Sequence, residues 1–325
     1  MAALKPTIAV IGVGIIALVI FLHSNSNQIM QQIKQVKALE VAVKREENVV
    51  KEMIKMIPDT GNTALGKPGE ASPQQEFDRL WDYVYTMQYN CTHGEYIGGK
   101  PSNGDGAYWL CSEPRFWPKG SDPNYKCLMY SFGVGGDFSF DDEIARRGCE
   151  VHSFDPTENL QDGLVRESGV IFHKWGISHE DNDHDSHGWK MRTLPTLIKE
   201  LGHNGRYLDY LKMDTESYEE GLMQQVIDHD LAKCVRHYAQ EIHLMGPITR
   251  PDRLKKCRHL FSAMGELNNQ GWRLYNTTDN CRWTTVPDPH ARQVQAKGQI
   301  VNSETTILWE TMFVNFDVKG PCKVE

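Results

Sequence analysis

Residues 127–157 have the sequence CLMYSFGVGGDFSFDDEIARRGCEVHSFDPT. An apolar run over 127–132 stops at the glycine-rich segment 133–136, and a helical pattern follows over 140–147. A second apolar run, 150–154, ends at an acidic residue. A strand, a glycine turn, a helix and a second strand in this order predict an α/β fold whose first turn contacts a ligand.

The glycine turn and Asp155 together indicate a nucleoside site. Glycines let the backbone approach a ligand, and the amino terminus of the next helix offers unpaired amide groups. The turn is GxGG and lacks the GxGxxG pattern of dinucleotide-binding folds. Asp155 follows Gly133 by 22 residues, a spacing at which an acid can accept both ribose hydroxyls. The alternative is that Asp155 only forms a turn before Pro156.

Downstream of this unit, a polar segment follows each of two further predicted strands. The third strand leads into Trp175–Ser178, where Ile177 is placed to contact an adenine ring, and the fourth ends at Asp214. The third and fourth strands are predicted at 169–173 and 207–213. Further strands are predicted at 240–244, 271–275 and 305–314, and a helix at 189–201.

Four segments resemble, in order, the membrane-anchored methyltransferase-like protein twenty-four family, a distant relative of the FkbM-type methyltransferases. They are 130–157, KWGIS at 174–178, LKMDTESYE at 211–219 and QEIHL at 240–244. The resemblance implies an α/β fold, a Rossmann-like class I methyltransferase sheet with helices on both faces. It also implies S-adenosylmethionine as the cofactor.

The same resemblance assigns cofactor contacts. Gly133 and Gly135 would face the methionine part, Asp155 the ribose and Ile177 the adenine. Ser131 stands where many Rossmann-like methyltransferases have an acid, and Asp137 is a candidate to substitute for it in part. The expected cofactor-binding set is Ser131, Gly133, Gly135, Asp137, Asp155, Ile177 and Asp214.

Methyl transfer to a hydroxyl requires alignment of the acceptor and removal of its proton. Asp214, Glu216 and His243 are the candidate catalytic residues, because ligands bind beyond the carboxyl ends of parallel strands. An acidic motif at this place in FkbM relatives supports the two acids. The alternatives are a helix cap or a partner for Lys212, and a core position for the histidine.

The loop 179–187 holds three histidines and four acids, which invites a metal site. Spacing alone fixes no ligand geometry, so we interpret it as a solvated loop and expect no metal. A second polar segment, 287–299 with Arg292 and Lys297, is expected to shape the acceptor site.

The first 75 residues predict a membrane anchor and a spacer. Residues 1–6 are expected to be a cytosolic tail and 7–22 a transmembrane signal anchor, with a cleaved signal peptide as the alternative. Residues 23–75 are predicted as a helical stem and linker, whose heptad spacing suggests a homodimer or a solvated spacer. The methyltransferase domain is then expected over 76–325, with 76–126 as a cap.

Several features favour a lumenal domain of a single-pass type II protein in the Golgi or endoplasmic reticulum. Eight scattered cysteines permit disulfides, and Asn90 and Asn276 begin glycosylation sequons. The net charge of −8 argues against a nucleic-acid partner.

We therefore expect O-methylation of a hydroxyl on a glycan or a small molecule. Four aromatic residues of the cap either stack on a sugar or form the core of the cap: Tyr108, Trp109, Phe116 and Trp117. The rival hypothesis is a catalytically degenerate domain that acts as a binding module. A nucleotide-sugar transferase or a dehydrogenase is disfavoured, since neither GxGxxG nor DxD follows a strand.

Overall fold

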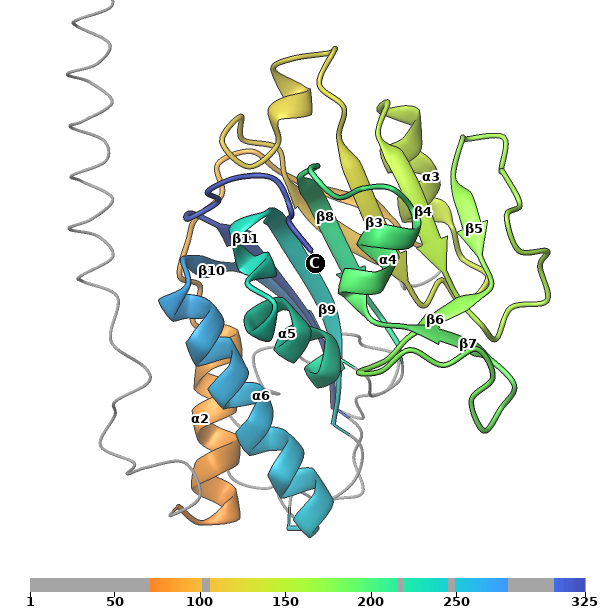
Figure 1. Cartoon of the computed structure of the whole chain (residues 1–325). Helices are drawn as coiled ribbons and strands as arrows, with labels where there is room; N and C mark the ends of the chain where they lie inside the picture. Colours follow the sequence, from red (N-terminus) through yellow and green to blue (C-terminus); the bar gives the residue numbers. More distant parts are fainter. Residues whose placement is uncertain (1–70, 101–105, 216–218, 245–248, 280–306, 325) are drawn as a thin grey trace, which may run out of the picture. The chain divides into compact units, whose positions relative to one another are not determined.

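The computed structural model describes residues 71–100, 106–215, 219–244, 249–279 and 307–324 (Figure 1). The predicted anchor, residues 23–70 of the predicted stem and linker, Glu216 and the segment 287–299 lie outside these residues, whereas residues 73–75 already belong to the first turn of a helix. Within the described ranges, no helix is both long enough and apolar enough to cross a membrane.

A seven-stranded sheet forms the centre of the domain (Figure 1). Its strands lie in the order β10 (Trp272–Asp279), β11 (Ile307–Asn315), β9 (Val235–Leu244), β8 (Leu208–Met213), β3 (Leu128–Phe132), β4 (Glu150–Phe154) and β5 (Ile171–His173). The strands from β9 to β5 run parallel, and β11 is antiparallel to both of its neighbours. Every residue of β3 and β8 is buried, as expected for central parallel strands covered on both faces.

Four helices pack on one face of the sheet in a single hydrophobic cluster. They are α2 (Pro73–Tyr85), α4 (Leu194–Glu200), α5 (Glu219–Asp228) and α6 (Pro251–Asn269). Figure 1 shows α2 and α6 side by side. Helix α2 begins at Pro73 because Ser72 and Gln75 form a capping box.

The opposite face is covered by α3 (Ser139–Arg146) and by the hairpin of β1 (Gly94–Gly98) and β2 (Ala107–Cys111). The expectation of helices on both faces is therefore confirmed. On this face Tyr108, Phe116 and Trp117 are at most 3% exposed and Trp109 is half-buried. Tyr108, Phe116 and Trp117 therefore form part of the core beneath the cap, as the alternative states, whereas Trp109 is partly exposed and packs on Tyr96.

Two local predictions are wrong. The helix expected over 189–201 is instead a short strand, β7 (Lys190–Arg192), paired with β6 (Trp175–Ile177), followed by α4. Thr193 is the N-cap and accepts a hydrogen bond from the Thr196 amide, so the helix cannot extend further back. The spacing of Phe77, Leu80, Trp81, Val84 and Met87 predicts one apolar helix face, but Met87 lies beyond the end of α2 and is 43% exposed.

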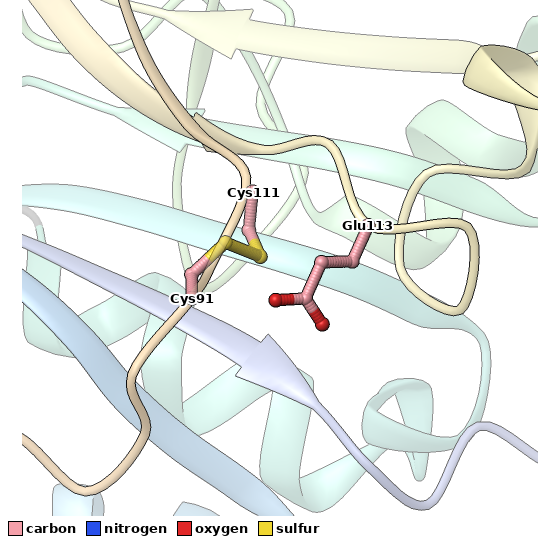
Figure 2. Close-up of side chains that lie close together, drawn as sticks. All are labelled: Cys91, Cys111 and Glu113. Carbon is pink, nitrogen blue, oxygen red and sulfur yellow. A yellow bond between two sulfur atoms is a disulfide. The ribbon is translucent and has the colours of Figure 1, made fainter.

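Three disulfides join segments on the domain: Cys91–Cys111, Cys127–Cys149 and Cys234–Cys322. Cys257 is a free, buried thiol, and Cys281 lies outside the described residues. Figure 2 shows Glu113 beside the first disulfide. Its carboxylate accepts hydrogen bonds from the Tyr89 hydroxyl and from Thr92, so Glu113 braces this loop.

Candidate active site

The glycine turn joins β3 to α3 and lies against the carboxyl end of β8. Gly133 has a φ of 73°, and a Cβ added there would lie 1.6 Å from the Asp214 carbonyl oxygen. Gly135 has a φ of 52°, but an added Cβ would meet nothing within 4 Å. The first glycine is therefore required by the packing of two strand ends, whereas the second is exposed and has no protein atom within 4 Å of the position that a Cβ would take.

Asp155 lies directly beside this turn. Its side chain is 5% exposed, and Oδ2 accepts a hydrogen bond of 3.1 Å from the Gly135 amide. Oδ1 accepts from the amide and the hydroxyl of Thr157, at 2.9 and 2.6 Å. Since a carboxylate offers about four acceptor sites, three protein bonds leave room for one more donor. Asp155 and Gly135 therefore lie together. The Thr157 contacts form the turn that the alternative assigned to Asp155, and the ribose contact stays a prediction.

Ser131 lies beneath the turn and is fully buried. The carboxylate of Asp141 on α3 accepts a hydrogen bond from the Ser153 hydroxyl and lies near the Ser131 hydroxyl, which itself makes no hydrogen bond of normal geometry to the described residues. Burial raises the pKa of Asp141, and the nearby Lys212 ammonium and both serine hydroxyls oppose that shift. An acid therefore does lie at this end of β3, although it comes from the next helix. Asp141 carries no functional signal in the sequence, because it belongs to an ordinary amphipathic helix pattern.

The other predicted replacement, Asp137, has a different local contact. Its Oδ1 accepts a hydrogen bond of 2.9 Å from the Ser139 amide at the start of α3. Its cofactor role, like that of Ser131, stays a prediction.

Lys212 connects the turn with the acidic side of the site. It stands opposite Ser131 in the β3–β8 pair. Its ammonium donates a hydrogen bond of 3.1 Å to the Gly133 carbonyl and lies 3.8 Å from Asp214 Oδ2. The alternative assignment of Asp214 as a partner for this lysine is thus seen in the structure, and it is compatible with a role in the site.

Asp214, Glu241 and His243 converge at the ends of β8 and β9. One ligand-type atom from each lies within 4.8 Å of the others. Glu241 and His243 are two residues apart on a strand, so their side chains share one face. Asp214 and His243 are among the predicted catalytic residues, but Glu241 is not. Its position two residues before His243 in the strand QEIHL places it on the same face.

Tyr108 of the cap reaches this acidic group. Its hydroxyl donates a hydrogen bond of 3.3 Å to Asp214 Oδ2. Burial raises the pKa of Tyr108 well above its usual value, and the charges of Asp214, Glu310 and Glu241 add to the effect. Glu310 on β11 stands directly opposite Glu241 in the antiparallel register, so both project from the same face. The pairing of β9 with β11 therefore brings Glu310, which no sequence motif marked, to the site.

Ile177 ends β6 and is 3% exposed. A Cβ on the preceding Gly176 would lie 3.1 Å from Pro156 Cγ, so this strand passes beside the turn that follows Asp155. The placement suits an adenine contact, which stays a prediction.

Acids of the 179–187 loop mainly hold the loop itself. Asp185 accepts hydrogen bonds from the His187 and Trp189 amides, and Asp183 pairs with Arg192 at 2.6 Å. Elsewhere, Glu150, His152 and His203 form a second close group. Arg206 lies 2.5 Å from Glu150 in this group, so the carboxylate there already has a cationic partner.

Four features define the class of protein. The sheet is parallel apart from one reversed strand, a glycine turn follows β3, an acid follows β4, and polar residues lie at the ends of β8 and β9. These are the features of a Rossmann-like methyltransferase. A family profile described as "Methyltransferase domain" matches residues 51–291. The chain belongs to this methyltransferase-domain family.

Curated relatives agree with this assignment. The chain is 28% identical to the probable methyltransferase-like protein 24 of Homo sapiens over 225 residues, which are 65% of this chain and 60% of that protein. Identity to the protein of the same description from Rattus norvegicus is 28% over 216 residues, covering 63% and 58%. The resemblance to the methyltransferase-like protein 24 family is thereby confirmed, and the matched region spans about 60% of the human relative.

Among solved structures, similarity extends to a 16S rRNA (adenine(1408)-N(1))-methyltransferase from Catenulisporales acidiphilia, solved with the cosubstrate SAM. The sequences are 14% identical, and the match covers 70% of this chain and 99% of that one with a TM-score of 0.33.

Proposed function

We propose that this chain is an S-adenosylmethionine-dependent methyltransferase that methylates a hydroxyl group of a glycan or a small molecule in the secretory pathway. The observation that carries the proposal is the position of Gly135. It borders open space, its amide is bound to Asp155, and the same turn contacts the strand end that holds Asp214. A nucleoside site and a group of proton acceptors therefore meet at one edge of the sheet.

In this site the cofactor would lie along the glycine turn. Asp155 would accept a hydrogen bond from the ribose, and Ile177 would contact the adenine. Lys212 is 3% exposed, and its ammonium lies at the turn, 3.1 Å from the Gly133 carbonyl oxygen. Its positive charge would attract the carboxylate of the methionine part.

Transfer would proceed by in-line displacement. The acceptor oxygen forms a bond to the methyl carbon, the carbon–sulfur bond breaks, and the electron pair stays on sulfur. The acceptor proton passes to a neighbouring base. Asp214 suits this contact, since its side chain is 23% exposed while His243 is buried. His243 is oriented by Glu219, whose Oε1 lies 2.5 Å from Nδ1.

The proposal is tested with the full-length chain and methyl-labelled S-adenosylmethionine, against a panel of glycans, lipids and small alcohols. Label should appear in a hydroxyl-bearing acceptor, and Asp214→Asn should reduce the rate about 100-fold or more. Asp185→Asn, in the 179–187 loop, is the matched control and should keep the full rate. Calorimetry with S-adenosylmethionine separates the rival function: a folded chain that does not bind the cofactor would be a binding module.

Secretory location is supported by the three disulfides and by one sequon. Asn90 is exposed in a loop, whereas Asn276 is half-buried within β10 and accepts a hydrogen bond from Thr278. We therefore expect a glycan on Asn90. In secreting cells, Asn90→Gln should abolish the mobility shift caused by glycosidase treatment, and Asn276→Gln should preserve it. A shift that persists in Asn90→Gln would contradict this assignment.

A further inference from the structure

The side chains of Asp214, Glu241 and His243 offer carboxylate oxygens and an imidazole nitrogen, which are common ligands of divalent metal ions in proteins. Two carboxylates and an imidazole meet, with the relevant atoms within 4.8 Å of one another. Glu241 and His243 are 5% and 2% exposed, and Asp214 is the more accessible member. Donor atoms bound to one metal ion at about 2.0–2.2 Å lie about 3–4 Å apart. Small side-chain rotations would therefore close the group around an ion.

The protonation of His243 is set by a residue outside this group. Glu219 is fully buried, and its Oε1 lies 2.5 Å from His243 Nδ1. Because a carboxylate accepts, Nδ1 carries the proton and donates it. The other ring nitrogen, Nε2, lies 3.6 Å from Glu241 Oε2, on the side of the two acids. A carboxylate on one imidazole nitrogen is the usual support of a histidine that binds a metal through the other.

Charge at the group also favours a cation. Glu310 projects from the same face as Glu241 in the β9–β11 pair. Glu310 is 3% exposed, so a further carboxylate is buried on the face that holds Glu241. Lys212 lies 3.8 Å from Asp214 and also acts on Asp141, and Lys256 lies 3.2 Å from Glu219. Buried acids gathered on one face are stabilised when a multivalent cation lies between them.

We propose that Asp214, Glu241 and His243 bind one divalent metal ion, with Glu219 orienting His243 from behind. Mixed carboxylate and imidazole donors suit ions of the Mn²⁺ and Zn²⁺ class. The three ligands leave coordination positions on the accessible side of Asp214. There the ion would hold an acceptor hydroxyl and favour transfer of its proton to Asp214, a role that rests on the proposed function. The proposal differs from the sequence-based expectation of no metal, which is drawn from the loop 179–187.

The test uses the full-length chain and Mn²⁺ alone, with no S-adenosylmethionine present. Electron paramagnetic resonance reports free Mn²⁺ by its six-line signal, so a titration yields stoichiometry and affinity. We expect one Mn²⁺ per chain. Glu241→Gln and Asp214→Asn should each weaken binding at least tenfold, and Glu219→Gln about 10- to 100-fold. Circular dichroism checks the fold, and Asp214→Asn, at the most accessible ligand, provides the result if Glu241→Gln does not fold.

The matched control is the second group of the same residue types. His203→Gln alters the group of Glu150, His152 and His203 and should leave Mn²⁺ binding unchanged. The proposal is overturned if the native chain leaves all Mn²⁺ free, in which case an imidazolium held between Glu219 and Glu241 explains the geometry. It is equally overturned if Asp214→Asn binds like the native chain, or if His203→Gln abolishes binding. Calorimetric binding of S-adenosylmethionine is a separate measurement, so failure of the metal site and failure of the proposed function are distinguishable.

Discussion

Replacement of Asp155 by alanine tests the cofactor site most directly. The carboxylate has three protein donors, two from Thr157 and one from the Gly135 amide, which leaves about one acceptor site. A ribose hydroxyl that donates to this site forms a charge-assisted hydrogen bond. Such bonds contribute about 1.5–3 kcal/mol. Asp155→Ala should therefore raise the dissociation constant for S-adenosylmethionine about 10- to 150-fold.

The neighbouring threonine sharpens this expectation. Thr157→Val removes the hydroxyl that donates to Oδ1 and frees a second acceptor site, so cofactor affinity should stay the same or increase. Asp185→Ala is the control, because Asp185 also accepts hydrogen bonds from backbone amides but lies in the 179–187 loop. Isothermal titration calorimetry measures all three variants, with circular dichroism as the check of folding. An unchanged affinity in folded Asp155→Ala would refute the assignment of this acid to the nucleoside.

The other predictions concern the turn, a disulfide and acid stability. Gly133→Ala should prevent correct folding, since its Cβ would lie 1.6 Å from a backbone oxygen, whereas Gly135→Ala should fold but lose cofactor affinity in calorimetry. Serine at both Cys234 and Cys322, whose separation is 88 residues, should lower the urea-derived unfolding free energy by about 4–5 kcal/mol; a loss below about 1 kcal/mol would count against the bridge. Burial lowers the pKa of His173 to about 4, so its contribution to stability is present above pH 6.5 and is lost as pH falls towards 4, by at most about 3 kcal/mol. His173→Phe should show a smaller loss between pH 7 and 4.5, and an equal loss would contradict the assignment.

The alternating pattern of strands and turns was enough to predict the elements around the cofactor site. Residues 127–157 form β3, α3 and β4 with boundaries close to those expected. Local signals are strong there, because central parallel strands are apolar throughout and glycines mark the turn between them. The helix predicted over 189–201 was wrong at its start, because apolar periodicity does not reveal an N-cap. Thr193 is the N-cap of α4, so the helix begins only after it.

What the sequence by itself determined was the order of the elements, the glycine turn and the acid that follows the second strand. Only the tertiary structure decided which side chains meet at the edge of the sheet. Tyr108 and Asp214 are 106 residues apart, and Glu241 meets Glu310 only because β11 inserts antiparallel beside β9. Strand order and register determine these contacts, and both arise from long-range packing that no local spacing encodes.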